Sequence, residues 1–216
     1  MPEALSRQLF VEARPQGLKA GQMLFAAGQP GDGCYLLDKG LLKVIVTSAR
    51  GEERTIAILG PGAVVGELSM IDGRPRSASV IALSDCLLRF TSRDAFAKFM
   101  ATHPHANEAL LAMLAFRLRQ ADDALAATSF LTVKGRVARA LVELAEYIGT
   151  PSACGQILLH EKVSLADLAA MAGVARENVS RVLSEWRRRK LLTGSPRYYC
   201  LNDIAALRRE IADNRD

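Results

Sequence analysis

Short runs of apolar and β-branched residues, separated by glycine-bearing turns, fill the chain from about residue 18 to residue 92. The strands predicted from these runs are residues 34–37, 41–47, 55–59, 78–82 and 86–90. Short strands at this spacing are typical of a β-barrel or β-sandwich. A helix-like segment, Gly66-Glu67-Leu68, interrupts them. Because functional sites often break the regular pattern of a fold, we expect one here.

The hydrophobic period becomes helical after residue 91. Ser92, or Thr91, is predicted to cap a short helix through Met100, and Pro104 to begin a long helix reaching about Ser129. Apolar residues spaced by three and four on the long helix predict a two-stranded coiled coil, and hence a dimer. The seam residues are Leu111, Leu114, Leu118, Ala121 and Leu125. The helix could also pack on its own domain, through a wider apolar face that includes Leu110, Met113 and Phe116.

The last third of the chain is predicted to be mostly helical. After a hinge at residues 130–132, Thr132 is expected to cap a helix, and Asn202 is expected to cap the final one. Between them lie a helix over 133–148, a loop over 151–155, a strand over 156–159, helices over 164–172 and 175–189, and a hairpin over 192–201. The two short helices, joined at Gly173, match a helix-turn-helix with a following wing.

The outward face of the second short helix has the chemistry of DNA recognition. It carries Arg176, Glu177, Ser180, Arg181 and Arg188. In the major groove arginine reads guanine and glutamate reads the cytosine amino group. The residues expected to face the core are Leu165, Leu168, Ala169, Val174, Val179, Val182 and Leu183, with Ser164 as the cap of the first helix. Arg197 or Tyr198 of the wing could touch phosphate. The alternative is a three-helix core whose arginines are only solvated.

Composition and charge agree with a chain of two unlike parts. The 216 residues could form one large or two small domains, and the content of hydrophobic and charged residues is that of a soluble globular protein. The formal net charge is +5, and residues 134–216 contribute +4 of it, with 14 Lys and Arg against 10 Asp and Glu. This asymmetry fits a nucleic-acid surface joined to a near-neutral module. No apolar run is long enough for a bilayer and no secretory start is evident, so we expect a cytoplasmic protein without a membrane partner.

Cysteine and histidine usage argues against metal or enzymatic chemistry. Cys34, Cys86, Cys154 and Cys200 are scattered, and the three histidines have no metal-ligand spacing. No Ser/His/Asp set or Cys/His pair is recognisable, so we predict that the protein is not an enzyme. Redox control at Cys34 or Cys86 stays an alternative, although neither has an evident basic activator in the sequence.

The segment Gly66–Ala78, GELSMIDGRPRSA, predicts an anion site. Backbone N–H groups at a helix start, the Ser77 hydroxyl and the Arg76 guanidinium can converge on one phosphate. A carboxylate such as Glu67 is unusual beside a phosphate unless it receives hydroxyl donors, as a ribose would supply. The segment, here called the cassette, therefore predicts a nucleotide phosphate with its sugar attached.

With these motifs in order, the whole chain resembles the cyclic-AMP receptor protein/FNR family of bacterial transcription regulators. The resemblance implies an α+β protein with a cyclic-nucleotide-binding β-roll over residues 1–103, a dimerisation helix and hinge over 104–131, and a winged helix-turn-helix over 132–216. It implies double-stranded DNA, a second copy of the chain and RNA polymerase as partners. A cyclic nucleotide would be the effector.

The resemblance also implies roles for single residues. Glu67 would accept the ribose 2′-hydroxyl, and Arg76 and Ser77 would hold the cyclic phosphate, helped by backbone groups of Gly66, Leu68 and Ala78. Arg117 matches the arginine of the long helix that reaches towards the nucleotide. Arg176, Glu177 and Arg181 match the base-reading residues, beside Ser164 and Ser180 on the DNA-binding surface. The implied half-site is TGTGA-like, repeated as a palindrome.

Departures from the family pattern narrow the choice of effector. No cysteine precedes Cys34 and no histidine precedes His103, which disfavours iron–sulfur and haem sensing. Where cyclic-AMP receptors have a Thr-Ser pair for adenine, this chain has Ala121-Asp122. An aspartate could accept from the guanine N1–H and amino groups, which hints at cyclic GMP or relaxed selection between cyclic AMP and cyclic GMP. Alternatively, Asp122 and Asp123 are solvated or pair with Arg119. A regulator without a nucleotide effector also remains open.

Overall fold

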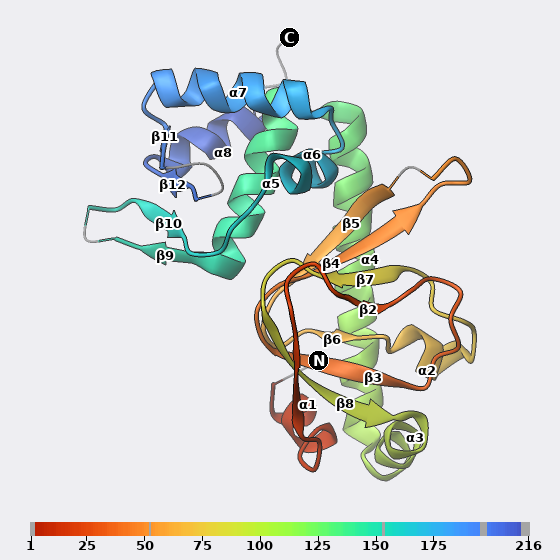
Figure 1. Ribbon diagram of the computed structural model, residues 1–216. Coiled ribbons are helices and arrows are strands. Elements are labelled where there is room, and N and C mark those ends of the chain that lie inside the picture. Colours follow the sequence, from red (N-terminus) through yellow and green to blue (C-terminus); the bar gives the residue numbers. More distant parts are fainter. Residues whose placement is uncertain (1–2, 52, 153, 195–197, 213–216) are drawn as a thin grey trace. The chain divides into compact units, whose positions relative to one another are not determined.

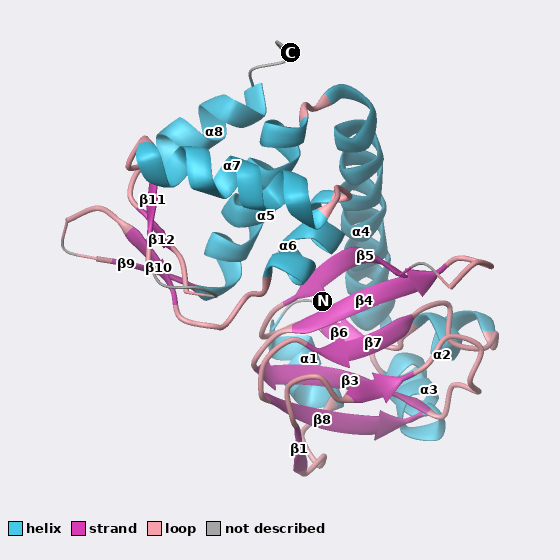
Figure 2. Cartoon of the chain, turned by 45° about the horizontal axis from the view of Figure 1, so that its top comes forward, coloured by secondary structure: helices cyan, strands magenta, loops and turns pink. Residues whose placement is uncertain are grey.

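The computed structural model describes residues 3–51, 53–152, 154–194 and 198–212, with the side chains described from residue 5 onward (Figure 1). The chain divides into two compact units. The first comprises the residues up to Val46 together with Ala57–Asp122, and the second comprises Thr47–Ile56 and the residues from Asp123 on. Strands dominate the first unit and helices the second (Figure 2). None of the helices in the described ranges combines the length and apolarity needed to cross a bilayer.

Two four-stranded antiparallel sheets form the β-roll. Their strand orders are β1-β8-β3-β6 and β2-β7-β4-β5. The strands are β1 (Pro15–Leu18), β2 (Met23–Phe25), β3 (Gly33–Lys39), β4 (Leu42–Thr47), β5 (Glu53–Leu59), β6 (Val64–Val65), β7 (Ser79–Ala82) and β8 (Cys86–Ser92). A core that includes Phe25, Leu37, Leu42, Val80 and Leu88 is buried between them. This packing brings β6 and β7, which flank the cassette in the sequence, into one small domain.

Four helices accompany the sheets: α1 (Glu3–Leu9), α2 (Leu68–Asp72), α3 (Arg93–Thr102) and α4 (Pro104–Phe130). Ser92 caps α3 by accepting from Ala95 N, as predicted. Helix α4 is a single uninterrupted rod (Figure 1). Its first turns pack into a second apolar cluster through Leu110, Met113 and Leu114. The helix therefore packs on its own domain near its start.

The rest of the α4 seam is uncovered. Leu111, Leu118 and Leu125 follow at intervals of seven residues, and they are 67%, 64% and 68% exposed. A spacing of seven residues keeps side chains on nearly the same face of a helix. The helix thus presents a row of exposed leucines in addition to the residues that it buries.

The second unit is built around α5 (Val133–Ile148), which Thr132 caps by accepting from Gly135 N. The other helices are α6 (Leu165–Ala172), α7 (Arg176–Arg188) and α8 (Ile204–Ala212). A small sheet has the order β11-β12-β10-β9, with β9 (Gly149–Pro151), β10 (Ile157–Leu159), β11 (Leu192–Thr193) and β12 (Cys200–Leu201). The fully buried Leu141, Leu168, Leu183, Trp186 and Leu207 lie in the interior of this unit.

The predicted α+β organisation, with a β-rich N-terminal domain, a long helix and a helix-turn-helix, is confirmed. Several short elements were missed: α1, β1, β2, β6 and β9. The predicted cap of the last helix was wrong. Asp203, not Asn202, accepts from Ala206 N (2.8 Å), because the Asn202 amide is occupied by the Lys190 carbonyl and the Thr193 hydroxyl.

Candidate functional site

Gly66 gives the cassette its shape. It follows β6 directly and has φ +84°, in the left-handed region that favours glycine. A Cβ at this position would lie 2.4 Å from Nη1 of Arg76. Glycine therefore permits two things at once: the turn into α2 and the close approach of the Arg76 guanidinium.

Arg76 is buried, with its side chain only 2% exposed. Its Nη1 donates to the Gly66 carbonyl (2.8 Å), its Nη2 donates to Asp32 Oδ1 (2.9 Å), and its guanidinium lies 4.3 Å from the centre of the Phe25 ring. Its Nε is buried with no hydrogen-bond partner among the described residues. A buried N–H without a partner is rare and costly, which makes it a candidate donor to a ligand oxygen.

Glu67 is 1% exposed and forms an ion pair with Arg117 of α4. Arg117 also donates through its other terminal nitrogen to the Val64 carbonyl. Burial raises the pKa of Glu67, while the charges of Arg117 and Arg76 act in the opposite direction without cancelling it. The fold thus brings the carboxylate and both arginines of the predicted nucleotide site together.

The other predicted cassette residues differ in exposure. Ser77 and Leu68 are exposed, whereas Ala78, next to β7, is buried. The arrangement offers a guanidinium N–H without a partner, a second arginine and a carboxylate. This donor and acceptor set fits an anion that carries hydroxyl groups, because the arginines can hold the anion while the carboxylate accepts from a hydroxyl.

The residues predicted to choose the purine lie outside this cluster. Ala121 and Asp122 are exposed on α4. Among the described residues neither has a hydrogen bond or ion pair with the cassette, and no ion pair joins Asp122 or Asp123 to Arg119. The backbone carbonyl of Asp123 accepts from Arg139 of α5 (2.8 Å).

Sequence reasoning missed three supports of the cassette. Asp32 and Phe25 hold the Arg76 guanidinium, and Arg93 donates to the carbonyls of Gly31 and Ser69 (both 2.9 Å), which ties α2 to the loop before β3. Asp32 lies in a glycine- and proline-rich turn whose composition indicates only a turn. No pattern in the sequence marks it as the partner of Arg76.

The helix-turn-helix forms as predicted. Ser164 and Asp167 make a reciprocal capping box at the start of α6, and Gly173 ends α6 in the left-handed region at φ +61°. The Ser164 hydroxyl is therefore already engaged, since it donates to Asp167 Oδ2 (2.5 Å) and accepts from Asp167 N (3.1 Å). Val179, Val182 and Leu183 of α7 are buried, as expected.

The opposite face of α7 is open. Arg176, Glu177, Ser180 and Arg181 are exposed, and together with Leu165 and Ser184 they line a shallow surface hollow. The prediction that Leu165 faces the core was wrong, because its side chain is 40% exposed at the first position of α6. The hollow thus includes one apolar residue, from α6, that the helical pattern alone assigned to the interior.

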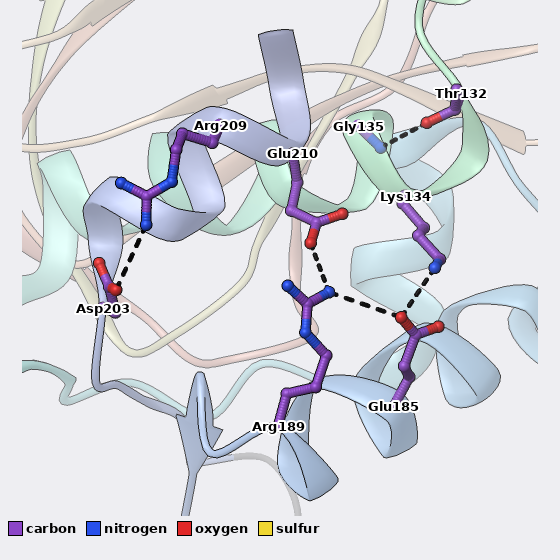
Figure 3. A network of polar contacts seen from close by, with 8 residues as sticks. All are labelled: Thr132, Lys134, Gly135, Glu185, Arg189, Asp203, Arg209 and Glu210. Carbon is purple, nitrogen blue, oxygen red and sulfur yellow. Dashed lines mark hydrogen bonds and ion pairs between the residues drawn. The ribbon is translucent and has the colours of Figure 1, made fainter. Parts of the chain in front are cut away.

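Charged contacts tie α7 to its neighbours (Figure 3). Lys134 in the first turn of α5 donates to Glu185 Oε1 (2.7 Å), and Arg189 donates to Glu210 of α8 (2.6 Å). At the other end of α7, Arg136 of α5 donates to the Gly173 carbonyl in the turn (3.3 Å). Residues of α5 therefore contact the helix-turn-helix in two places: in the turn before α7 and near the C-terminal end of α7.

The wing is described in part. Arg197 lies outside the described residues. Tyr198 is exposed, and Nζ of Lys162 lies 5.9 Å from its ring centre. Within the described ranges no group of three or more His, Cys, Asp or Glu side chains is placed to hold a metal ion.

Fold and comparisons together define a class of protein: a transcription regulator that joins a domain of the cyclic nucleotide-binding family to a helix-turn-helix domain. Residues 15–103 match the cyclic nucleotide-binding domain, and residues 135–210 match the Crp-like helix-turn-helix domain. The chain is 33% identical over 186 residues to the CRP-like cAMP-activated global transcriptional regulator of Mycobacterium tuberculosis, covering 86% of this chain and 81% of that protein.

A second relative and a solved structure agree. The cyclic AMP receptor protein of Thermus thermophilus is 40% identical over 163 residues, covering 76% of this chain and 72% of that protein. The structure of FixK2 from Bradyrhizobium japonicum shares the fold with a TM-score of 0.81 at 22% identity, over 94% of this chain and 99% of that one. The chain belongs to the cyclic-AMP receptor protein/FNR family of transcription regulators.

Proposed function

We propose that the protein is a cyclic-nucleotide-responsive, homodimeric regulator that binds a palindromic, TGTGA-like DNA site. The observation that carries the proposal is the cluster of the buried Glu67 and Arg76 with the partly buried Arg117, in which Arg76 Nε has no partner among the described residues. A cyclic phosphate would accept from Arg76 and Ser77, helped by backbone groups of the cassette. A ribose hydroxyl would donate to Glu67.

The effector is cyclic AMP or cyclic GMP. Relatives described as cAMP-activated support cyclic AMP. The exposed Asp122, in the position where a cyclic-AMP receptor has a hydroxyl residue, supports cyclic GMP or a relaxed choice. Calorimetric titration of the wild type with both nucleotides shows which one binds more tightly. If Asp122 contacts the base, the Asp122→Thr variant should shift this preference towards cyclic AMP.

The exposed leucines of α4 support the dimer. Leu111, Leu118 and Leu125 form a heptad row that a second copy of α4 would bury. We expect the wild type to be a dimer by light scattering. The Leu118→Glu variant should shift the species to a monomer, whereas Glu108→Lys, an exposed change elsewhere on α4, should not.

Nucleotide control requires different affinities of the ligand for two arrangements of the dimer. The hinge at residues 130–132 would then set the two recognition helices about 34 Å apart, one turn of DNA. RNA polymerase is the proposed further partner of the DNA-bound dimer.

DNA binding measured by fluorescence anisotropy, with and without each cyclic nucleotide, tests the proposal. We expect tighter and sequence-selective binding with the effector. Equal binding in its absence would overturn nucleotide control and favour a ligand-independent regulator. Control through Cys34 or Cys86 is less favoured, because both are buried, and burial, helped by the charge of Glu67, raises the pKa of the Cys34 thiol to about 12.

A further inference from the structure

Leu165 occupies an unusual place for a large apolar side chain. It begins α6, whose interior positions Leu168, Ala169 and Ala172 are buried. By helical period Leu165 lies three residues before Leu168, on the side that packs inward. The side chain nevertheless remains 40% exposed.

The surroundings of Leu165 are polar and belong to the DNA-reading face. The hollow that it lines is otherwise formed by α7, through Arg176, Glu177, Ser180, Arg181 and Ser184. Two of these side chains are cationic, and for neither does the described part of the chain provide an ion pair. Among the described residues that line the hollow, Leu165 is the only apolar one.

A hollow of this composition suits the edges of base pairs. Arginine and glutamate recognise guanine and cytosine by hydrogen bonds, while the 5-methyl group of thymine is the apolar feature of the major groove. A leucine beside base-reading arginines can bury that methyl group. Without such a contact, an exposed leucine side chain buries little apolar surface and so contributes little hydrophobic stabilisation.

We propose that Leu165 is a specificity-determining residue that contacts the 5-methyl group of a thymine in each half-site. The proposal rests on the proposed function of α7 as the helix that enters the major groove. Burying one methyl-sized group contributes a threefold to fivefold preference for thymine, roughly the effect of one buried CH₂. The contact adds sequence information at a position that Arg176, Glu177 and Arg181 do not read.

Uracil scanning tests the contact, because uracil differs from thymine only by lacking the 5-methyl group. A binding site is first selected from random duplexes with the wild-type protein. Each thymine is then replaced by uracil, and the dissociation constant is measured by anisotropy at fixed salt. The wild type should lose about threefold to fivefold at one thymine of each half-site.

Leu165→Ala should bind the thymine site about threefold to fivefold more weakly and should be insensitive to uracil at that position. Leu165→Met, which keeps an apolar side chain, should keep the sensitivity. Leu158→Ala is the matched control, since Leu158 of β10 is 42% exposed and does not line the hollow. Circular dichroism verifies that each variant is folded.

The outcomes separate this proposal from the function on which it rests. If Leu165→Ala and the wild type respond equally to uracil at every position, the methyl contact is overturned although DNA recognition stands. If no uracil affects the wild type, the contact is also overturned. If the wild type selects no sequence at all, the proposed function of α7 fails, and the methyl contact fails with it.

Discussion

The cassette and α7 both carry arginines, but their surroundings are opposite. Arg76 is buried, and Asp32 and the Gly66 carbonyl already accept from it. Arg176 and Arg181 are exposed, and the described residues provide no ion pair for them. A buried, oriented guanidinium suits a small ligand that must be held in one pose. Exposed guanidiniums suit a long polyanion, because they need little desolvation before the DNA arrives.

This difference predicts whether a substitution changes stability, ligand binding or both. In the cassette, the charged groups of Glu67 and Arg76 are buried and already paired, so losing either should change stability and ligand binding together. On α7, a lost charge leaves nothing buried, so DNA binding should change while stability does not. Four variants test this contrast, and they are ordered by decreasing change in free energy.

Glu67→Ala should have the largest effect on stability. It leaves the Arg117 guanidinium without its carboxylate in a largely buried place. Removing one partner of a buried pair costs about 3–5 kcal/mol, and the partial exposure of Arg117 favours the lower end. Urea unfolding measures this loss. The exposed Glu108→Ala on the same long helix should change the free energy of unfolding by less than about 0.5 kcal/mol.

Arg76→Ala should weaken cyclic-nucleotide binding at least a hundredfold, or about 2.7 kcal/mol, because a phosphate loses its charge-assisted donor. Isothermal titration calorimetry measures the affinity. Arg74→Ala removes an exposed arginine two residues away and should retain wild-type affinity. If the heat of nucleotide binding were unchanged in Arg76→Ala, the assignment of Arg76 as the phosphate-binding residue would be wrong.

Arg181→Ala should relax discrimination at one guanine by about 1–3 kcal/mol and leave the melting temperature unchanged. Anisotropy with each base substituted in turn measures the effect. We expect Arg188, the last residue of α7, to contact phosphate, so Arg188→Ala provides the comparison: its loss should weaken binding to all sequences alike and reduce the salt dependence. A fall in the melting temperature with Arg181→Ala would contradict the contrast between the two regions.

Lys134→Met should have the smallest effect, a loss of less than about 1 kcal/mol in unfolding free energy at neutral pH. In the wild type, the hydrogen bond from Lys134 holds the pKa of Glu185 below the ordinary value. A lowered carboxylate pKa stabilises the fold above the unfolded pKa of about 4.3, and this contribution is lost as the pH falls through the lowered value. The difference in unfolding free energy between wild type and variant should therefore reach its full size above about pH 5 and should vanish in acid. Lys98→Met, at an exposed lysine, should show no such pH dependence.

Local interactions made much of the fold predictable. Ser92, Thr132 and Ser164 cap the helices for which they were predicted, because a cap involves only residues three positions apart. The turn at Gly173 was recognisable for the same reason. Short strands such as β1 and β6 escaped prediction because two to four residues carry too little periodicity to stand out from a loop.

The order of roll, long helix and helix-turn-helix could be predicted from the sequence alone, as could Glu67 and Arg76 as candidate residues of a nucleotide site. Arg117 entered as a site residue through the family resemblance. The pairing of Arg117 with Glu67, the bond from Arg76 to Asp32 and the exposure of Leu165 beside the arginines of α7 became visible only in the folded chain. Periodicity and capping act over one or two helical turns. Charge pairing and burial depend on which distant segments the folded chain places side by side.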